Sequence, residues 1–296
     1  MTEYLGLFKE FELKDRNRLK EIFYNAGRNL SVHNFANLFM WRRFHKYKWT
    51  EYENQVLIYA EKDDFAVLAP GNDLTPDDYL KLSELLQNNK RKAEFAFVPV
   101  DFAEKYPEMS DQFIIEKDED NADYIYTSEK LADLPGRNLH KKKNLLKQFQ
   151  RGYPDYKCVE LTPEYFQDCI DHTEKWCEAT ECAIVPYAYE RDAITRGFEH
   201  FDELEMGGLV IIVDDEVAAF SVYNRLSHNA ALIHFEKFDR EVKGSGQAIN
   251  WETARRLRDD YEYLNREQDL GIPGLRRAKQ SYLPDRWAVT LTLKRK

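Results

Sequence analysis

The order of secondary-structure signals is repeated along the chain, and this repeat is the feature that most restricts its fold. Each half begins with two segments of helical apolar spacing, continues with three strand-like segments, and ends with one more helix and one more strand. No sequence identity links the two copies, so only the pattern repeats. The sequence therefore predicts an α+β (mixed α/β) fold of two tandem domains, each a mostly antiparallel sheet flanked by helices.

The segment 111–153 separates the two copies and changes the sign of its charge along its length. Its first part, EKDEDNADYIY, is acidic, whereas its second part, GRNLHKKKNLLKQFQRGY, is basic and has helical apolar spacing. A helix with a solvated basic side between two domains fits this composition. The predicted boundaries are an N-terminal domain at 1–135, a basic connecting helix at 136–155 and a C-terminal domain at 156–296.

Composition restricts the class of protein. Of the 296 residues, 43% are hydrophobic and 14% aromatic, which is typical of a folded chain. The net charge of −10 argues against a DNA-binding protein but leaves room for a local basic face. We expect a cytoplasmic protein without a transmembrane segment, because no secretory signal or long apolar run is found. The four cysteines form no CxxC pair and join no histidine cluster, so no metal site is predicted.

A glycine loop follows the strand-like segment 229–239 and leads into a helix. Gly244, Ser245 and Gly246 are the candidate phosphate loop, since backbone N–H groups at a helix start can bind an anion. Acyltransferases of the GNAT fold hold the pyrophosphate of coenzyme A in this way, with the pattern [Q/R]xxGx[G/A]. Here Glu241 takes the first position, and a carboxylate disfavours a diphosphate. Acetyl-CoA or another acyl-CoA therefore stays one alternative, and a plain helix-capping turn is the other.

The stretch NREQDLGIPGLRRAKQSY sorts its charges into an acidic and a basic block. If 261–269 is a strand, Asn265, Glu267 and Asp269 share one face. Two neighbouring carboxylates repel each other, which raises one pKa towards a value useful for proton transfer. The alternative, which the sequence alone favours, is that they pair with the arginines a few residues later.

The basic block 274–282 reads as a short helix with Arg276 and Lys279 on one face. A site with carboxylates on one side and cations on the other suits a substrate that has both an amine and a phosphate or carboxylate. In 229–239, Glu236 shares a strand face with His234, and a charge among apolar residues needs a partner or a function. We assign His234 no role, because a lone histidine is more often part of the core. The candidate substrate-binding residues are Arg276, Lys279, Lys237 and Tyr282.

Three stretches carry a family resemblance: 124–154, HFEKFD at 234–239 and 265–284. The chain resembles, over nearly its whole length, a bacterial family related to the C-terminal catalytic domain of phosphatidylglycerol lysyltransferases, long catalogued as a domain of unknown function. The resemblance implies two tandem GNAT-like acyltransferase domains, as in the Fem-type aminoacyltransferases. It also implies transfer of an aminoacyl group from aminoacyl-tRNA to an amine or hydroxyl acceptor, with no cofactor required.

Under this resemblance, the basic helix has a candidate tRNA-binding role, in which side chains follow the phosphates of an acceptor stem. The alternative is a solvated basic face. The residues concerned are Lys141, Lys142, Lys143, Lys147 and Arg151. The chain lacks the membrane-spanning flippase portion of the full lysyltransferases. A lipid acceptor would thus be reached from the inner face of the membrane, and a small molecule or a peptide is an equal alternative.

Three functions stay open: an aminoacyl transferase, an acyl-CoA-dependent N-acyltransferase, and a non-catalytic binding or regulatory module. In the first, Glu267 or Glu236 accepts the proton of the acceptor, and Asn265 and Asp269 orient the reacting groups. Arg276 and Lys279 then hold phosphate or developing negative charge. The amino acid, the acceptor and the oligomeric state do not follow from the sequence.

Overall fold

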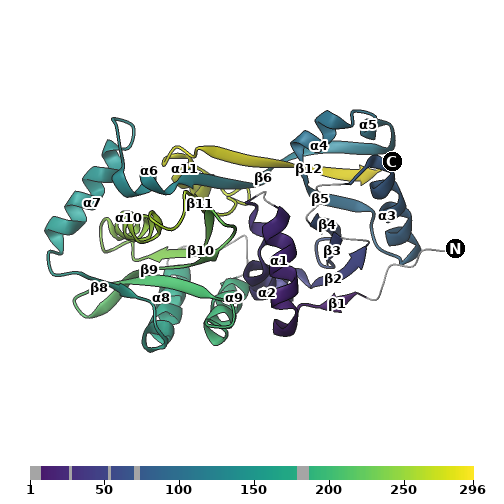
Figure 1. Cartoon of the computed structure of the whole chain (residues 1–296). Helices are drawn as coiled ribbons and strands as arrows, with labels where there is room; N and C mark the ends of the chain where they lie inside the picture. The colour runs from purple at the N-terminus through teal and green to yellow at the C-terminus, as the bar shows by residue number, and fades with distance from the viewer. Residues whose placement is uncertain (1–7, 27–28, 53–54, 70–73, 179–186) are drawn as a thin grey trace. The chain divides into compact units, whose positions relative to one another are not determined.

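A computed structural model describes residues 8–26, 29–52, 55–69, 74–178 and 187–296, and the chain divides into two compact units (Figure 1). Unit 1 comprises Met1–Asp123, Gln268–Ile272 and Trp287–Lys296. Unit 2 comprises Tyr124–Glu267 and Pro273–Arg286. Each unit is therefore built from segments that are far apart in the sequence.

Unit 1 is a mostly antiparallel sheet with helices. Its strand order is β1-β2-β3-β4-β5-β12-β6, in which β4 and β5 form a parallel pair joined by a helix. The helix that follows Thr75 begins with a capping box, in which the Thr75 and Asp78 side chains satisfy backbone N–H groups of the first turn. The elements are β1 (Lys9–Glu10), α1 (Arg16–Ala26), α2 (Phe35–His45), β2 (Tyr47–Tyr52), β3 (Gln55–Ala60), β4 (Phe65–Ala69), α3 (Pro76–Asn88), β5 (Glu94–Pro99), α4 (Val100–Lys105), α5 (Met109–Gln112), the first part of β6 (Phe113–Thr127) and β12 (Arg286–Arg295).

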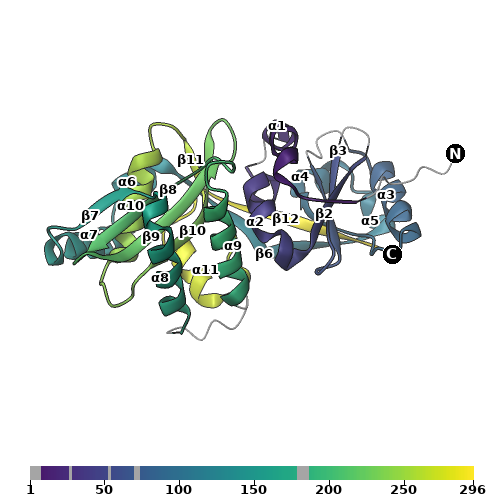
Figure 2. The same cartoon turned by 90° about the horizontal axis from the view of Figure 1, so that it is seen from below.

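Unit 2 has the strand order β6-β11-β10-β9-β8-β7. Figures 1 and 2 show α10 on one face of this sheet, and α8 and α9 on the other. The apolar side chains of α10 and α7 form one core with those of β8, β9 and β10. The elements are α6 (Ser128–Asp133), α7 (His140–Gly152), β7 (Lys157–Glu160), α8 (Phe166–Glu178), α9 (Tyr187–Glu199), β8 (Met206–Val213), β9 (Glu216–Arg225), β10 (Ala230–Phe238), α10 (Ser245–Leu257), β11 (Tyr263–Asn265) and α11 (Pro273–Gln280).

The register of the strands confirms the repeat predicted from the sequence. In unit 1, β2, β3 and β4 form an antiparallel meander, and α3 then crosses over to the parallel neighbour β5. In unit 2, β8, β9 and β10 form the same meander, and α10 crosses over to the parallel β11. The predicted fold class is therefore confirmed: two GNAT-like units, each with a mostly antiparallel sheet flanked by helices.

The units differ in extent from the domains predicted at 1–135, 136–155 and 156–296. The acidic segment is not a connection but the strand β6, which pairs with β11 in unit 2. The basic helix is α7, and its Leu146 and Phe149 are buried in the core of unit 2. The C-terminal strand β12 pairs with β5, which assigns it to unit 1. Pairing between strands that are far apart in the sequence leaves no local signal, so composition does not reveal it.

Candidate functional site

The segment after β11 is a turn rather than a continuing strand. Strand β11 ends at Asn265, and Glu267 has a φ of 55°, so the predicted common face of 261–269 is wrong beyond Asn265. The buried Asn265 Oδ1 accepts a hydrogen bond from the Glu267 N–H at 2.7 Å, and Asp269 Oδ1 accepts one from the Gly271 N–H at 2.9 Å. Asn265 lies in unit 2 and Asp269 in unit 1. Both side chains shape the local backbone, as short polar side chains do in turns.

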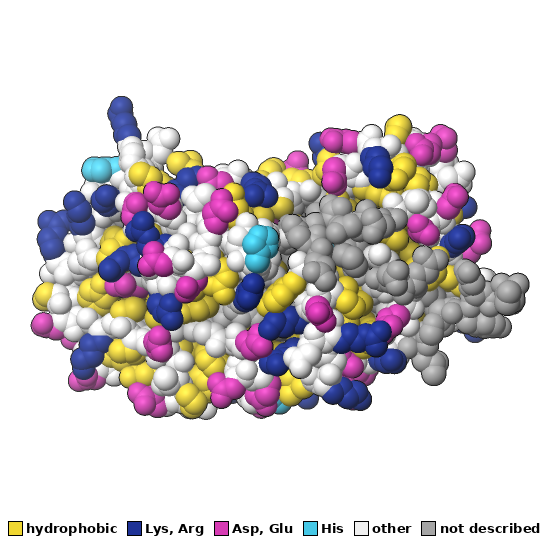
Figure 3. Space-filling view, in the orientation of Figure 1, with side chains coloured by type: hydrophobic (Ala, Val, Ile, Leu, Met, Phe, Trp, Pro, Cys, Tyr) yellow, Lys and Arg dark blue, Asp and Glu magenta, His cyan; other side chains and the backbone are white. Residues whose placement is uncertain are grey.

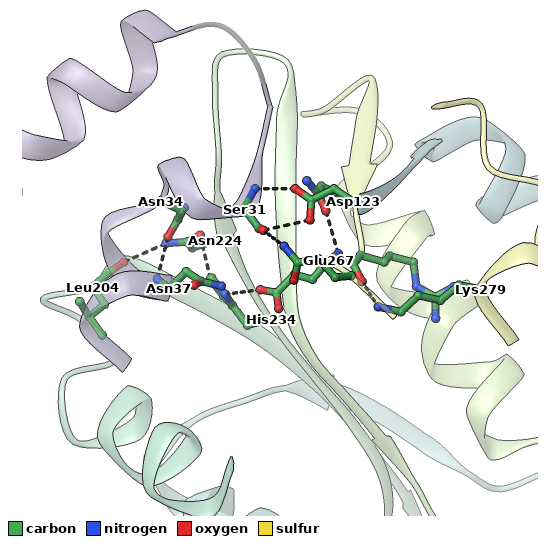
Figure 4. A network of polar contacts seen from close by, with 12 residues as sticks. Ser31, Asn34, Asn37, Asp123, Leu204, Asn224, His234, Glu267 and Lys279 are labelled. Carbon is green, nitrogen blue, oxygen red and sulfur yellow. Dashed lines mark hydrogen bonds and ion pairs between the residues drawn. The ribbon is translucent and has the colours of Figure 1, made fainter. Parts of the chain in front are cut away.

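Glu267 contacts His234 (Figure 4). The amide nitrogen of Asn224 donates to the Leu204 carbonyl at 3.4 Å, so Asn224 Oδ1 faces the imidazole. His234 Nε2 donates to this oxygen at 3.1 Å. His234 Nδ1 then lies 3.2 Å from Glu267 Oε1. This separation is a hydrogen-bond distance, so the imidazole orients the Glu267 carboxyl group.

The surroundings of Glu267 hold its carboxylate in one place. The His234 side chain has no exposed surface, and Glu267 keeps 17% of its side-chain surface exposed. His234 lies where β10 is irregular, between Ile233 and Phe235 in the pairing with β9. The Glu267 carbonyl also accepts a hydrogen bond from the Tyr124 N–H at 3.2 Å. A glutamate with positive φ is strained, and such strain is maintained where the neighbours fix the residue.

Glu236, the other candidate base, forms a buried ion pair with Arg266. The guanidinium donates to Glu236 Oε2 at 2.9 and 2.8 Å, and both side chains are less than 15% exposed. Burial alone would lower the pKa of Arg266, but the Glu236 carboxylate outweighs it and raises that pKa, so Arg266 stays charged. The Arg266 Nη1 atom is buried without a hydrogen-bond partner. Glu236 is thus committed to neutralising an internal cation.

Arg266 is one member of a cluster of cations and tyrosines. Its guanidinium lies 5.0 Å from the ring centre of Tyr282, and Lys142 Nζ lies 4.2 Å from the same ring. Burial raises the pKa of Tyr282 to about 12. The pKa of Lys142 is lowered, first by burial and then by the charge of Arg266. Tyr282 and Lys142, predicted to bind substrate and tRNA respectively, therefore come together inside unit 2.

The other basic residues predicted on α7 lie on its outer side, where Figure 3 shows blue side chains gathered at the left edge. Within this group, Lys143 Nζ donates to the Asp133 carbonyl at 3.3 Å, and the Arg151 side chain donates to the Lys147 carbonyl at 3.1 Å. These exposed residues are Lys141, Lys143, Lys147 and Arg151. The helix thus has an outer basic side, while Lys142 turns inward.

The predicted helix with Arg276 and Lys279 is confirmed as α11, and Arg276 is half-buried. Lys279 is 8% exposed, and its ammonium donates to the Arg266 carbonyl at 2.6 Å. Lys237 is also buried, and its Nζ lies 2.7 Å from a Glu190 carboxylate oxygen. The ammonium groups of Lys279 and Lys237 therefore hold parts of unit 2 together, and their substrate-binding role stays a prediction.

The glycine loop is closely packed. Gly244 has a φ of 89°, and a Cβ there would lie 2.7 Å from the Leu145 carbonyl oxygen. A Cβ on Gly246 would lie 2.9 Å from the ring of Phe238. The buried Ser245 hydroxyl donates to the Asp239 carbonyl at 2.7 Å. Packing against α7 and β10 thus accounts for both glycines, which is what a helix-capping turn requires.

We expect Gly244→Ala to lower the free energy of unfolding by about 2–4 kcal/mol, because positive φ and a backbone clash add together. Gly136→Ala is the matched control: Gly136 has a φ of 76°, but no atom lies within 4 Å of its added Cβ. The control should cost only about 1 kcal/mol. Urea unfolding followed by circular dichroism measures both. Equal losses in the two variants would show that packing does not explain Gly244.

Three residues of this arrangement escaped the sequence reasoning: His234, Asn224 and Arg266. His234 was considered and left without a role, since the glutamate beside it is 33 positions later. Asn224 faces it from the neighbouring strand β9. The only local signal was the motif 265–269, in which Arg266 stands between two residues that were selected. Among the described residues, no His, Cys, Asp or Glu group is arranged to hold a metal ion.

Solved structures with a similar fold are known. A conserved protein of unknown function from Bacteroides thetaiotaomicron is 29% identical, with a TM-score of 0.90, over 98% of this chain and 99% of that one. The C-terminal domain of a putative lysylphosphatidylglycerol synthetase from Agrobacterium fabrum is 14% identical, with a TM-score of 0.65, over 96% and 92% of the chains. FemX is 8% identical, with a TM-score of 0.56, over 97% and 96%. No curated protein sequence matches the chain.

The helices of the described residues include none that is both long and apolar enough to span a bilayer. The family model described as "Phosphatidylglycerol lysyltransferase, C-terminal" matches residues 25–290. This match includes all of unit 2, most of unit 1 and all three stretches that carry the resemblance seen in the sequence. The chain therefore belongs to the phosphatidylglycerol lysyltransferase C-terminal family.

Proposed function

We propose that this protein is an aminoacyltransferase that takes an aminoacyl group from aminoacyl-tRNA and passes it to an amine or hydroxyl acceptor. The family and the fold indicate a transferase of acyl or aminoacyl groups. The single observation that carries the proposal is the contact between Glu267 and His234. It provides a carboxylate that holds and returns a proton, which is the group such a reaction needs.

The proposed reaction begins with attack of the acceptor amine or hydroxyl on the carbonyl carbon of the aminoacyl ester. The acceptor loses its proton to Glu267, while His234 keeps the carboxylate oriented through Nδ1. The tetrahedral intermediate then breaks its ester C–O bond, and the departing ribose hydroxyl takes up the proton from Glu267. The new amide or ester and a free tRNA end are the products, so no oxidant, metal or bound nucleophile is consumed.

Other residues act on Glu267 in this proposal. Asn224 fixes the imidazole of His234 in the orientation that presents Nδ1 to the carboxylate. Asn265 fixes the backbone of Glu267. We assign Glu236 to neutralising Arg266 rather than to proton transfer, because both oxygen–nitrogen contacts are at ion-pair distance. The exposed basic side of α7 supports the tRNA-binding proposal through its charge alone.

The experiment uses radiolabelled lysyl-tRNA as the probe, since the family description names a lysyltransferase and the Agrobacterium fabrum relative is described as a putative lysylphosphatidylglycerol synthetase. We expect the purified chain to accelerate loss of label from the tRNA when phosphatidylglycerol vesicles or a soluble amine are added. Label appearing in the lipid identifies a lipid acceptor, and label appearing in the amine identifies a soluble one. No acceleration with a set of different aminoacyl-tRNAs would contradict the proposal and favour a non-catalytic module.

The acyl-CoA-dependent alternative is favoured by one observation, the glycine loop between β10 and the start of α10. Glu241 and the packing of Gly244 count against it. Calorimetric titration with acetyl-CoA distinguishes the two donors. Saturable binding with release of the acetyl group to an amine would replace aminoacyl-tRNA by acyl-CoA in the proposal.

A further inference from the structure

Unit 1 contains a cavity of about 620 Å³ that the proposed reaction does not use. It lies where α2 ends and β2 begins, and strand β1 and the residues after it form another wall. Its volume is in the range of sites for small ligands of mononucleotide size. All its lining residues belong to unit 1, whereas Glu267 and His234 belong to unit 2.

The lining of the cavity is cationic over an aromatic floor. Phe11 and Phe39 are buried beneath it, at 1% and 3% exposure. The guanidinium carbon of Arg42 lies 3.6 Å from the ring centre of Phe39, and Nη1 donates to the Phe39 carbonyl at 2.5 Å. The ring contact and this hydrogen bond hold the guanidinium against Phe39. The cationic residues of the lining are Arg42, Arg43, Lys46 and Lys48.

Each of the three carboxylates of the lining lies close to a cation. Two of these cations, Arg91 and Lys14, are not part of the lining. Glu61 accepts from Arg91 at 3.0 Å and also lies 3.2 Å from Lys48. Burial alone would raise the pKa of Glu61, but the hydrogen bonds from Arg91 and Lys48 outweigh it and lower that pKa, so Glu61 is ionised. Glu12 pairs with Lys14. Within the lining itself, the four cations Arg42, Arg43, Lys46 and Lys48 outnumber the carboxylates of Glu10, Glu12 and Glu61 by one.

The lining is thus cationic on balance, in a chain of net charge −10. Cations in the last turn of α2 do favour the negative end of the helix dipole. That explanation covers Arg42 and Arg43, whereas Lys48 on β2 lies 3.2 Å from Glu61 and 3.9 Å from Glu10, which it pairs with. Arginine and lysine together, around a ring-lined floor, provide the planar and point-charge contacts that phosphate groups prefer.

We propose that this cavity binds a phosphate-bearing ligand of mononucleotide size, either a free nucleotide or the end of a single-stranded RNA. The phosphate contacts Arg43 and Lys46, and the remainder of the ligand lies over the guanidinium of Arg42. The proposal does not depend on the proposed transferase activity, because no residue of the cavity takes part in that reaction.

Isothermal titration of the full chain with inorganic pyrophosphate, 5′-AMP and a single-stranded RNA trinucleotide tests the proposal. We expect saturable binding of 5′-AMP, with a Kd that rises with NaCl concentration. The double variant Arg43→Gln, Lys46→Asn should raise the Kd about tenfold or more. Both residues are exposed, and asparagine tolerates the φ of 52° at Lys46, so the fold is retained. Tighter binding of the trinucleotide than of 5′-AMP would identify an RNA end as the ligand.

The matched control is Lys141→Gln, Lys143→Gln, which removes two exposed positive charges from α7 in unit 2. This control should leave the Kd for 5′-AMP unchanged. Equal weakening by both double variants would show an effect of net charge alone and overturn the proposal. Absence of saturable binding for all three probes would overturn it too. Either failure leaves the assay with aminoacyl-tRNA unaffected, so the two proposals fail separately.

Discussion

Glu267→Gln should lower kcat for aminoacyl transfer by about 10²–10⁴-fold, the usual contribution of a general acid–base group. Glutamine has nearly the same size as glutamate and is no more strained than glutamate at the positive φ of this position. Its amide donates to His234 Nδ1. It cannot take up the proton of the acceptor. Because the contact with His234 is retained, thermal unfolding should change little. Single-turnover loss of label from lysyl-tRNA measures the rate of the chemical step without product release.

The control for this variant is Glu262→Gln, which makes the same substitution at an exposed position five residues earlier. It should have wild-type activity.

A positioning test uses Asn224→Ala, which removes the hydrogen-bond acceptor of His234 Nε2. We expect this variant to lower kcat with little change in KM and to alter the pH profile of kcat, since the imidazole that contacts Glu267 is then no longer held in one orientation. Full activity of Glu267→Gln would remove Glu267 from the mechanism.

The fold could be predicted because its signals are local. Helical spacing at Leu19, Ile22 and Phe23 predicts α1, and the Thr75-Pro76 pair predicts the start of α3. The C-terminal strand β12 was missed because its partner β5 lies almost 200 positions earlier in the chain. The alternating apolar residues of 286–295 are compatible with a strand, but they do not show which strand it pairs with or to which unit it belongs.

The candidate site could be predicted only in part. The motif 265–269 directed attention to Glu267, but the argument from a shared strand face failed, since β11 ends at Asn265. The side chain that contacts and orients Glu267 is His234, which lies on β10, the parallel neighbour of β11. Which side chains meet across two strands depends on register and on the irregularity of β10, neither of which composition specifies.

Glu236→Gln separates a structural from a catalytic role, and we expect it to lower the free energy of unfolding by about 3 kcal/mol or more. The substitution leaves the Arg266 charge inside unit 2 with a neutral partner, close to the Lys142 ammonium that already disfavours a further cation. Urea unfolding at neutral pH gives the free energy, and transfer assays at a temperature where the variant is folded give the activity. Activity per folded molecule should stay within a few-fold of wild type.

The double variant Glu236→Leu, Arg266→Met decides between the two roles. Removing both charges together replaces a buried ion pair by apolar groups of similar size, and this exchange is often neutral or stabilising by about 1–4 kcal/mol. Stability should therefore recover relative to Glu236→Gln, although the contacts of the Arg266 side chain with Tyr126 and Tyr282 are lost. If Glu236 were instead the proton acceptor, the double variant would regain stability but remain inactive. Recovery of both stability and transfer identifies Glu236 as the neutralising partner of Arg266 and leaves Glu267 as the carboxylate that carries the proton.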